Sequence, residues 1–148
     1  MNVEQIIKTE KKIPLESRTI IHFMLVNNKI NEAISVALKP FDVSVQQFNV
    51  LRILRGQKAK PANLSTLNER MVTKMSNTTR LVDKLILKGY VDRIICPSNR
   101  RKVEISITAA GRKVLKHMDA AMIKAEKSIL QNMSEKELEH LNILFNKF

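Results

Sequence analysis

The chain has 148 residues, which is enough for one folded domain but hardly enough for two independent ones. Its 26 Lys and Arg residues outnumber 14 Asp and Glu residues, giving a formal net charge of +12 and a pI near 10.1. This excess favours a polyanionic partner. Nucleic acid fits better than an anionic membrane surface, because the basic residues are spread over several segments rather than gathered on one amphipathic helix.

The expected compartment is the cytoplasm. No apolar run is long enough to span a membrane, and the first fourteen residues alternate charges with isoleucines, unlike a secretion signal. The single cysteine, Cys96, excludes an internal disulfide framework and agrees with a reducing compartment.

The first predicted element is a long amphipathic helix from Leu15 to Leu38. It follows Pro14 and is stopped by Pro40. Its apolar residues recur at steps of three and four, as one face of a helix requires. They are Ile20, Phe23, Met24, Ile30, Ala33, Ile34, Ala37 and Leu38.

Three short helices are predicted next. Ser44 and Gln47 form a capping box that starts a helix running to Gly56. After a loop over residues 57–62, Asn63 caps a helix over 64–71. A break at residues 72–74 leads into a third helix over 75–88, which Gly89 terminates.

The period then changes from helical to two, which predicts a β-hairpin. Residues 90–95 and 103–107 form its strands, joined across the basic tip PSNRR. Thr108 caps a long helix to about residue 131, and Ser134 with Glu137 starts a closing helix. The predicted fold is therefore mainly α with a small hairpin wing, the layout of a winged helix-turn-helix.

The third short helix has one packing face and one free face. A helical wheel places Thr78, Val82 and Leu85 on the first, and Asn77 and Arg80 on the second. Asn, Thr and Arg side chains bond base edges and phosphates in a major groove. An ordinary solvated helix face is the alternative, but a basic hairpin directly afterwards favours DNA recognition. The predicted recognition-helix contacts are Thr73, Lys74, Ser76, Asn77, Thr79, Arg80 and Lys84.

Five stretches between Ser44 and Leu115 match one family in a single register: SVQQFNVLRIL, LSTLNERM, SNTTRLVDKLILKGYVDR, CPSNRRKVEISIT and TAAGRKVL. They resemble the multiple-antibiotic-resistance regulator (MarR) family, and SEKELEHLNILFNKF resembles its closing helix. The resemblance implies one chain over 1–148, with a winged helix-turn-helix DNA-binding region at 41–108 and dimerisation helices at 14–40 and 109–148. It also implies a homodimer that places two recognition helices in successive major grooves.

The resemblance assigns a minor-groove contact to the wing. Arg101 matches the family's wing-tip arginine, with Arg100 as its basic neighbour, and Asn99 and Lys102 complete the predicted contact. Most relatives carry an aspartate at the position of Asn99, and that aspartate pairs with the arginine. Asparagine still bonds a guanidinium but removes one charge, so we expect a more positive and less rigid tip.

The dimer also has support in the residues themselves. The first and last two helices carry more apolar surface than one small head could cover, and the closing segment ends on Leu141, Ile143, Leu144, Phe145 and Phe148. A second copy is the simplest cover. Packing against the first helix of the same chain is the alternative.

Other candidate sites are weaker. The resemblance implies a small aromatic effector in the crevice between dimer helices and head, where Phe23, Phe48 and Leu51 are lining candidates that equally suit a core. Cys96 is a candidate redox sensor, but an inert small hydrophobe is the favoured interpretation. The three histidines lack metal-ligand spacing, so no metal is expected.

No catalytic constellation and no phosphate-binding Gly-rich loop is present, so neither an enzyme nor a cofactor is expected. The predicted function is a sequence-specific double-stranded-DNA-binding transcriptional regulator. It would act as a homodimeric repressor on a pseudo-palindromic operator, with release by a small ligand. Two alternatives remain: a sequence-indifferent nucleic-acid binder, with strongly salt-dependent affinity, and a protein-interaction module whose charge serves solubility.

Overall fold

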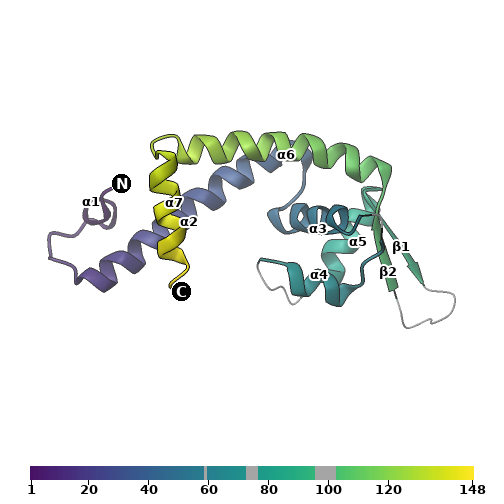
Figure 1. Ribbon diagram of the computed structural model, residues 1–148, viewed down its shortest axis with the longest axis horizontal. Coiled ribbons are helices and arrows are strands. Elements are labelled where there is room, and N and C mark those ends of the chain that lie inside the picture. Colours follow the sequence, from purple (N-terminus) through teal and green to yellow (C-terminus); the bar gives the residue numbers. More distant parts are fainter. Residues whose placement is uncertain (59, 73–76, 96–102) are drawn as a thin grey trace.

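The computed structural model describes residues 1–58, 60–72, 77–95 and 103–148. Helices α2 and α6 form a long arm, and α3, α4, α5 and a hairpin gather below one end of α6 (Figure 1). The fold class predicted from the sequence, mainly α with a small hairpin, is confirmed. The elements are α1 (Val3–Ile7), α2 (Leu15–Leu38), a short 3-10 helix η1 (Lys39–Phe41), α3 (Val45–Gly56), α4 (Leu64–Arg70), α5 (Thr78–Leu87), β1 (Val91–Ile95), β2 (Val103–Ile107), α6 (Ala109–Leu130) and α7 (Glu135–Phe145).

Side-chain caps fix where most of these helices begin. At α3 the Gln47 amide donates to Ser44 Oγ at 3.2 Å, and Gln47 Oε1 accepts from the Ser44 amide at 2.9 Å. Asn63 caps α4, Thr108 caps α6, and Ser134 forms the second capping box at α7. Each cap satisfies amides that the first helical turn leaves without partners. All four caps were predicted from the sequence.

The core lies where α3, α5, the hairpin and α6 meet. Its fully enclosed side chains come from every one of these elements, and full burial of a Leu, Ile, Phe or Met stabilises the fold by about 1.5–3 kcal/mol each. The helix-hairpin unit (residues 45–107) is thus packed onto the first half of α6. The largest of the enclosed side chains, which include one each from α2 and α4, are Phe48, Leu38, Leu51, Leu67, Leu85, Ile105, Leu115 and Met118.

A third segment of backbone, not predicted from the sequence, pairs with the hairpin. Strands β1 and β2 pair antiparallel, with Val91 opposite Ile107 and Ile95 opposite Val103. Ala62, from the predicted loop 57–62, then bridges Ile105: each amide donates to the other's carbonyl, at 2.8 and 2.7 Å. The bridge attaches the chain between α3 and α4 to the base of the hairpin.

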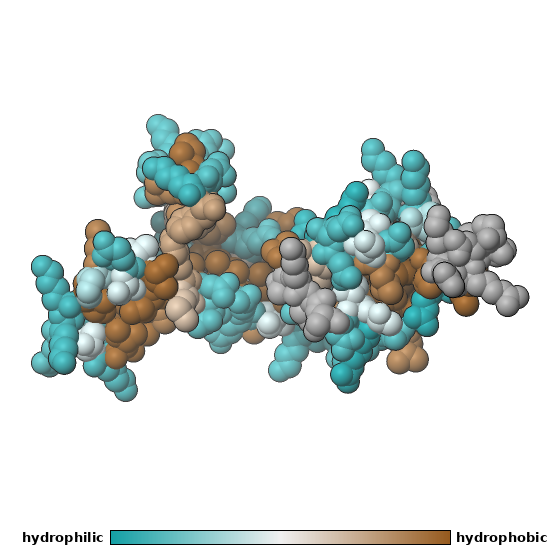
Figure 2. Space-filling model, turned by 90° about the horizontal axis from the view of Figure 1, so that it is seen from below, coloured by the Kyte–Doolittle hydropathy of each residue, from teal (hydrophilic) through white to brown (hydrophobic). Residues whose placement is uncertain are grey.

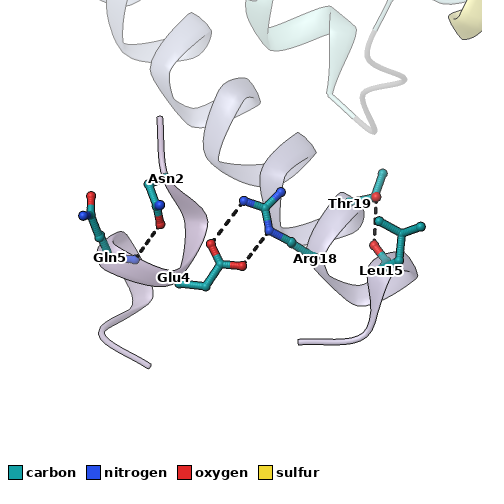
Figure 3. A network of polar contacts seen from close by, with 6 residues as sticks. All are labelled: Asn2, Glu4, Gln5, Leu15, Arg18 and Thr19. Atoms are coloured by element: carbon teal, nitrogen blue, oxygen red, sulfur yellow. Dashed lines mark hydrogen bonds and ion pairs between the residues drawn. The ribbon is translucent and has the colours of Figure 1, made fainter. Parts of the chain in front are cut away.

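Helix α1 was not predicted, since the sequence analysis assigned no element to the first fourteen residues. Its start is capped by Asn2, whose Oδ1 accepts from the Gln5 amide at 3.0 Å. Glu4 then forms a two-pronged ion pair with Arg18 of α2, at 2.6 and 3.1 Å (Figure 3). The hydrogen bond from Arg18 lowers the pKa of Glu4. The pair and the buried side chain of Val3 hold α1 against α2.

Candidate nucleic-acid interface

Helix α5 presents one packed face and one open face. Thr78, Val82 and Leu85 are buried, and the helix packs against α3 and α4. Asn77, Thr79, Arg80 and Lys84 are exposed. The two faces follow the helical period, because residues three and four apart lie on one side. The structure therefore brings the described members of the predicted contact set to an open surface, with Thr79 at its flank.

Lys88 differs from its neighbours on the wheel. Lys88 is not among the contacts predicted from the sequence, and its ammonium group binds the Asp42 carboxylate at the turn before α3. The hydrogen bond and the charge of Lys88 lower the pKa of Asp42. Lys88 thus ties the end of α5 to the turn before α3.

Two further ion pairs fix the surroundings of α5. Arg93 on β1 binds Asp83 on α5 at 2.8 Å, which links the helix to the hairpin. Arg55 on α3 binds Asp119 on α6. Exposed pairs of this kind contribute only about 0–1 kcal/mol, so their effect lies in orientation more than in stability. Sequence analysis missed both, because no local pattern marks partners that are distant along the chain.

Comparison with known proteins shows which family this chain resembles. The MarR family model matches residues 43–103. The multiple antibiotic resistance protein MarR of Escherichia coli (strain K12) is 25% identical over 130 residues, covering 86% of this chain and 87% of the relative. The uncharacterized HTH-type transcriptional regulator YdgG of Bacillus subtilis (strain 168) is 31% identical over 113 residues, 72% of each chain. The chain belongs to the MarR family.

A solved structure of the family agrees in fold. The crystal structure of a mutant MarR from E. coli complexed with operator DNA superposes with a TM-score of 0.75 and 25% identity, covering 90% of this chain and 93% of that one. YdgG is named as an HTH-type transcriptional regulator. The predicted membership of the MarR family and the predicted class of transcriptional regulator are confirmed.

Several predicted contacts of this MarR-family chain lie outside the described residues. They are Thr73, Lys74 and Ser76 before α5, the wing-tip residues Asn99, Arg100, Arg101 and Lys102, and the candidate thiol Cys96. Their roles stay predictions. The described strands β1 and β2 lead to and from the wing tip.

The remaining candidates divide between core and surface. Phe48 and Leu51 are enclosed in the core and do not line an open crevice. An open groove of about 550 Å³ lies instead between α2 and α6. Within the described ranges, no three His, Cys, Asp or Glu side chains are grouped to hold a metal ion. No helix of this described part is long and apolar enough to cross a membrane.

Proposed function

We propose that the protein is a sequence-specific, double-stranded-DNA-binding repressor that acts as a homodimer on a pseudo-palindromic operator. The observation that carries this proposal is the open face of α5, where Asn77, Arg80 and Lys84 are exposed opposite a fully packed face. Asn pairs with adenine and Arg with guanine in the major groove, while Lys neutralises phosphates. The wing arginines Arg100 and Arg101 would enter the flanking minor groove.

The apolar surface away from α5 supports the dimer. Phe23 of α2 packs against Phe145 and edge-to-face against Phe148, with ring centroids 6.0 and 5.8 Å apart, yet Phe148 stays 91% exposed. Packing within one chain therefore leaves Phe148 almost fully in solvent and covers Phe23 and Phe145 only in part. Apolar surface is also visible over the end that carries α1 and the start of α2 (Figure 2). Other exposed apolar residues of α2 and α7 include Leu15, Ile20, Met24, Val26, Ile143 and Leu144.

A second copy placed on this surface would cover it and relate two α5 helices by a two-fold axis. Such a dimer matches an inverted repeat whose half-site centres lie one helical turn, ~10 base pairs, apart.

The groove between α2 and α6 supports release by a small aromatic effector. Alanines from both helices give it apolar walls, and Lys29 and Lys124 offer ammonium groups to an anionic substituent. Because it lies on the α6 arm that carries the helix-hairpin unit, an occupant would bias the position of α5. If benzoate, used as the probe, binds in this groove, the melting temperature of the protein should rise.

The decisive experiment recovers a DNA site from a random pool with the purified protein and measures its symmetry by footprinting. Light scattering gives the oligomeric state. Asn77→Ala and Arg80→Ala should weaken binding to the recovered site by about 1–3 kcal/mol and weaken binding to random duplex less. Lys12→Ala is the matched control, because it removes one exposed charge that lies outside the DNA-binding region and the dimerisation helices.

Each alternative gives a different result. A sequence-indifferent binder would enrich no site, and a protein-interaction module would bind no DNA at physiological salt. Equal losses on recovered and random DNA for the α5 variants would contradict their assignment to base recognition. A monomer with a single asymmetric footprint would contradict the dimer.

A further inference from the structure

Helix α5 begins differently from α3, α4, α6 and α7. Ser44, Asn63, Thr108 and Ser134 each accept a hydrogen bond from an amide of the helix that they start. Asn77 holds the same position at α5, but its side chain accepts no bond from the amides of its helix. Asparagine is among the best capping residues, so a non-capping Asn77 leaves its amide group available to a partner outside the helix.

Thr78, the residue after Asn77, connects the start of α5 to α4. Thr78 is the first residue of α5 and is 4% exposed. Its hydroxyl donates a hydrogen bond to Oδ1 of Asn68 on α4, so the bond joins the two helices of the helix-turn-helix. Asn68 itself is exposed. Thr78 shares the packed face with Val82 and Leu85, away from the open face.

Apolar contacts and this hydrogen bond constrain α5 in different ways. Burial of Val82 and Leu85 fixes which face of the helix is packed, but the hydrophobic effect is non-directional and prefers no single bonding angle. A hydrogen bond weakens steeply away from its preferred angle, so it resists such rotation. A rotation at the first turn would move Asn77 and Arg80 sideways, and bidentate bonds to base edges need a defined approach.

We propose that the bond between Asn68 and Thr78 sets the rotational position of α5 and thereby its sequence specificity. Both are positioning residues: they act through Asn77 and Arg80 and do not themselves contact bases. The inference rests on the proposed function, because it assumes that the open face of α5 meets DNA. Asn68 and Thr78 are not among the predicted DNA contacts, and on this inference they control how strongly the protein prefers its own site to other sequences.

The test compares binding to the site recovered by the wild-type protein with binding to random duplex. Thr78→Val keeps the shape but removes the donor, and we expect about fivefold weaker binding to the recovered site with unchanged binding to random duplex. Thr78→Ser keeps the hydroxyl and should restore the preference. In an Asn68→Ala background, Thr78→Val should have no further effect. Melting temperatures should change little, because water replaces the donor at the exposed Asn68 oxygen.

Equal losses on both DNAs, or the same Thr78→Val effect with and without Asn68, would overturn the inference. Should Thr78→Val fail to fold, Asn68→Ala breaks the same bond from the exposed side and is measured in its place. If the wild-type protein recovers no site at all, the proposed function fails and this inference with it. A clear wild-type preference that the variants keep overturns this inference alone.

Discussion

The contact between α6 and the residue before β1 leaves no space for a side chain at Gly111, so Gly111→Ala should destabilise the protein. An added Cβ would lie 2.1 Å from the carbonyl oxygen of Tyr90, 2.9 Å from Cγ1 of Ile107 and 3.0 Å from the Tyr90 carbonyl carbon. The Tyr90 carbonyl also accepts from the Thr108 amide at 3.1 Å. Relief of the clash therefore requires movement of backbone, not of a flexible side chain.

The magnitude follows from two opposing terms. Overpacking a close contact costs about 1–3 kcal/mol or more, and a backbone clash this short belongs at the upper end. Alanine is the better helix former by about 1 kcal/mol, which offsets part of the cost. We expect a net loss of about 2 kcal/mol in the free energy of unfolding. For a chain of this size, that loss lowers the melting temperature by about 4–8 °C.

Thermal unfolding monitored by circular dichroism measures the effect, at equal protomer concentration because oligomers melt in a concentration-dependent way. Gly56→Ala is the matched control: Gly56 ends α3, and a Cβ there meets nothing within 4 Å. That variant should melt at or slightly above the wild-type temperature. A Gly111→Ala protein that melts as high as the wild type would refute the steric argument.

Two ion pairs yield further predictions. The pKa of Asp42 is lowered by Lys88 from its ordinary value of 3.8, so its stabilising contribution is present above that pH and is lost as the pH falls through the lower, folded pKa. Asp42→Asn should therefore flatten the fall in melting temperature below about pH 4; an unchanged acid profile would contradict the pairing. Asp119→Asn, which removes the partner of Arg55, should change the free energy of unfolding by less than about 1 kcal/mol in denaturant titrations, and a loss several times larger would show that the pair is not an ordinary exposed one.

Features with local causes could be predicted from the sequence. The caps Ser44 and Thr108 bond amides three residues away, so a short stretch of sequence contains both partners. The buried and open faces of α5 follow from helical periodicity in the same way. The helix α2 begins and ends at the predicted residues, because Pro14 and Pro40 act on their immediate neighbours.

Features that depend on tertiary contacts could not be predicted. Helix α1 has five residues, too few to be stable alone, and Glu4 binds Arg18 fourteen positions along the chain. The Asn68–Thr78 bond joins residues ten positions apart on two different helices, and hydrophobic periodicity does not indicate it. The bridge to Ala62 likewise depends on where the hairpin is placed by the core. The Glu4–Arg18 pair thus stabilises a helix that would not persist alone, whereas the other two contacts decide how elements are oriented.

Helix α6 connects the two parts of the proposed mechanism. It is an unbroken helix of 22 residues, which corresponds to about 33 Å of length. The first turn of α6 packs through Gly111 against Tyr90, the residue before β1. The groove between α6 and α2 lies along the second half of α6, nearer to α7. A close-packed contact does not deform gradually, so the helix-hairpin unit must follow any tilt of α6. An occupant that wedges α2 and α6 apart would therefore displace α5, although it touches no recognition residue, and in a dimer it would change the distance between the two recognition helices.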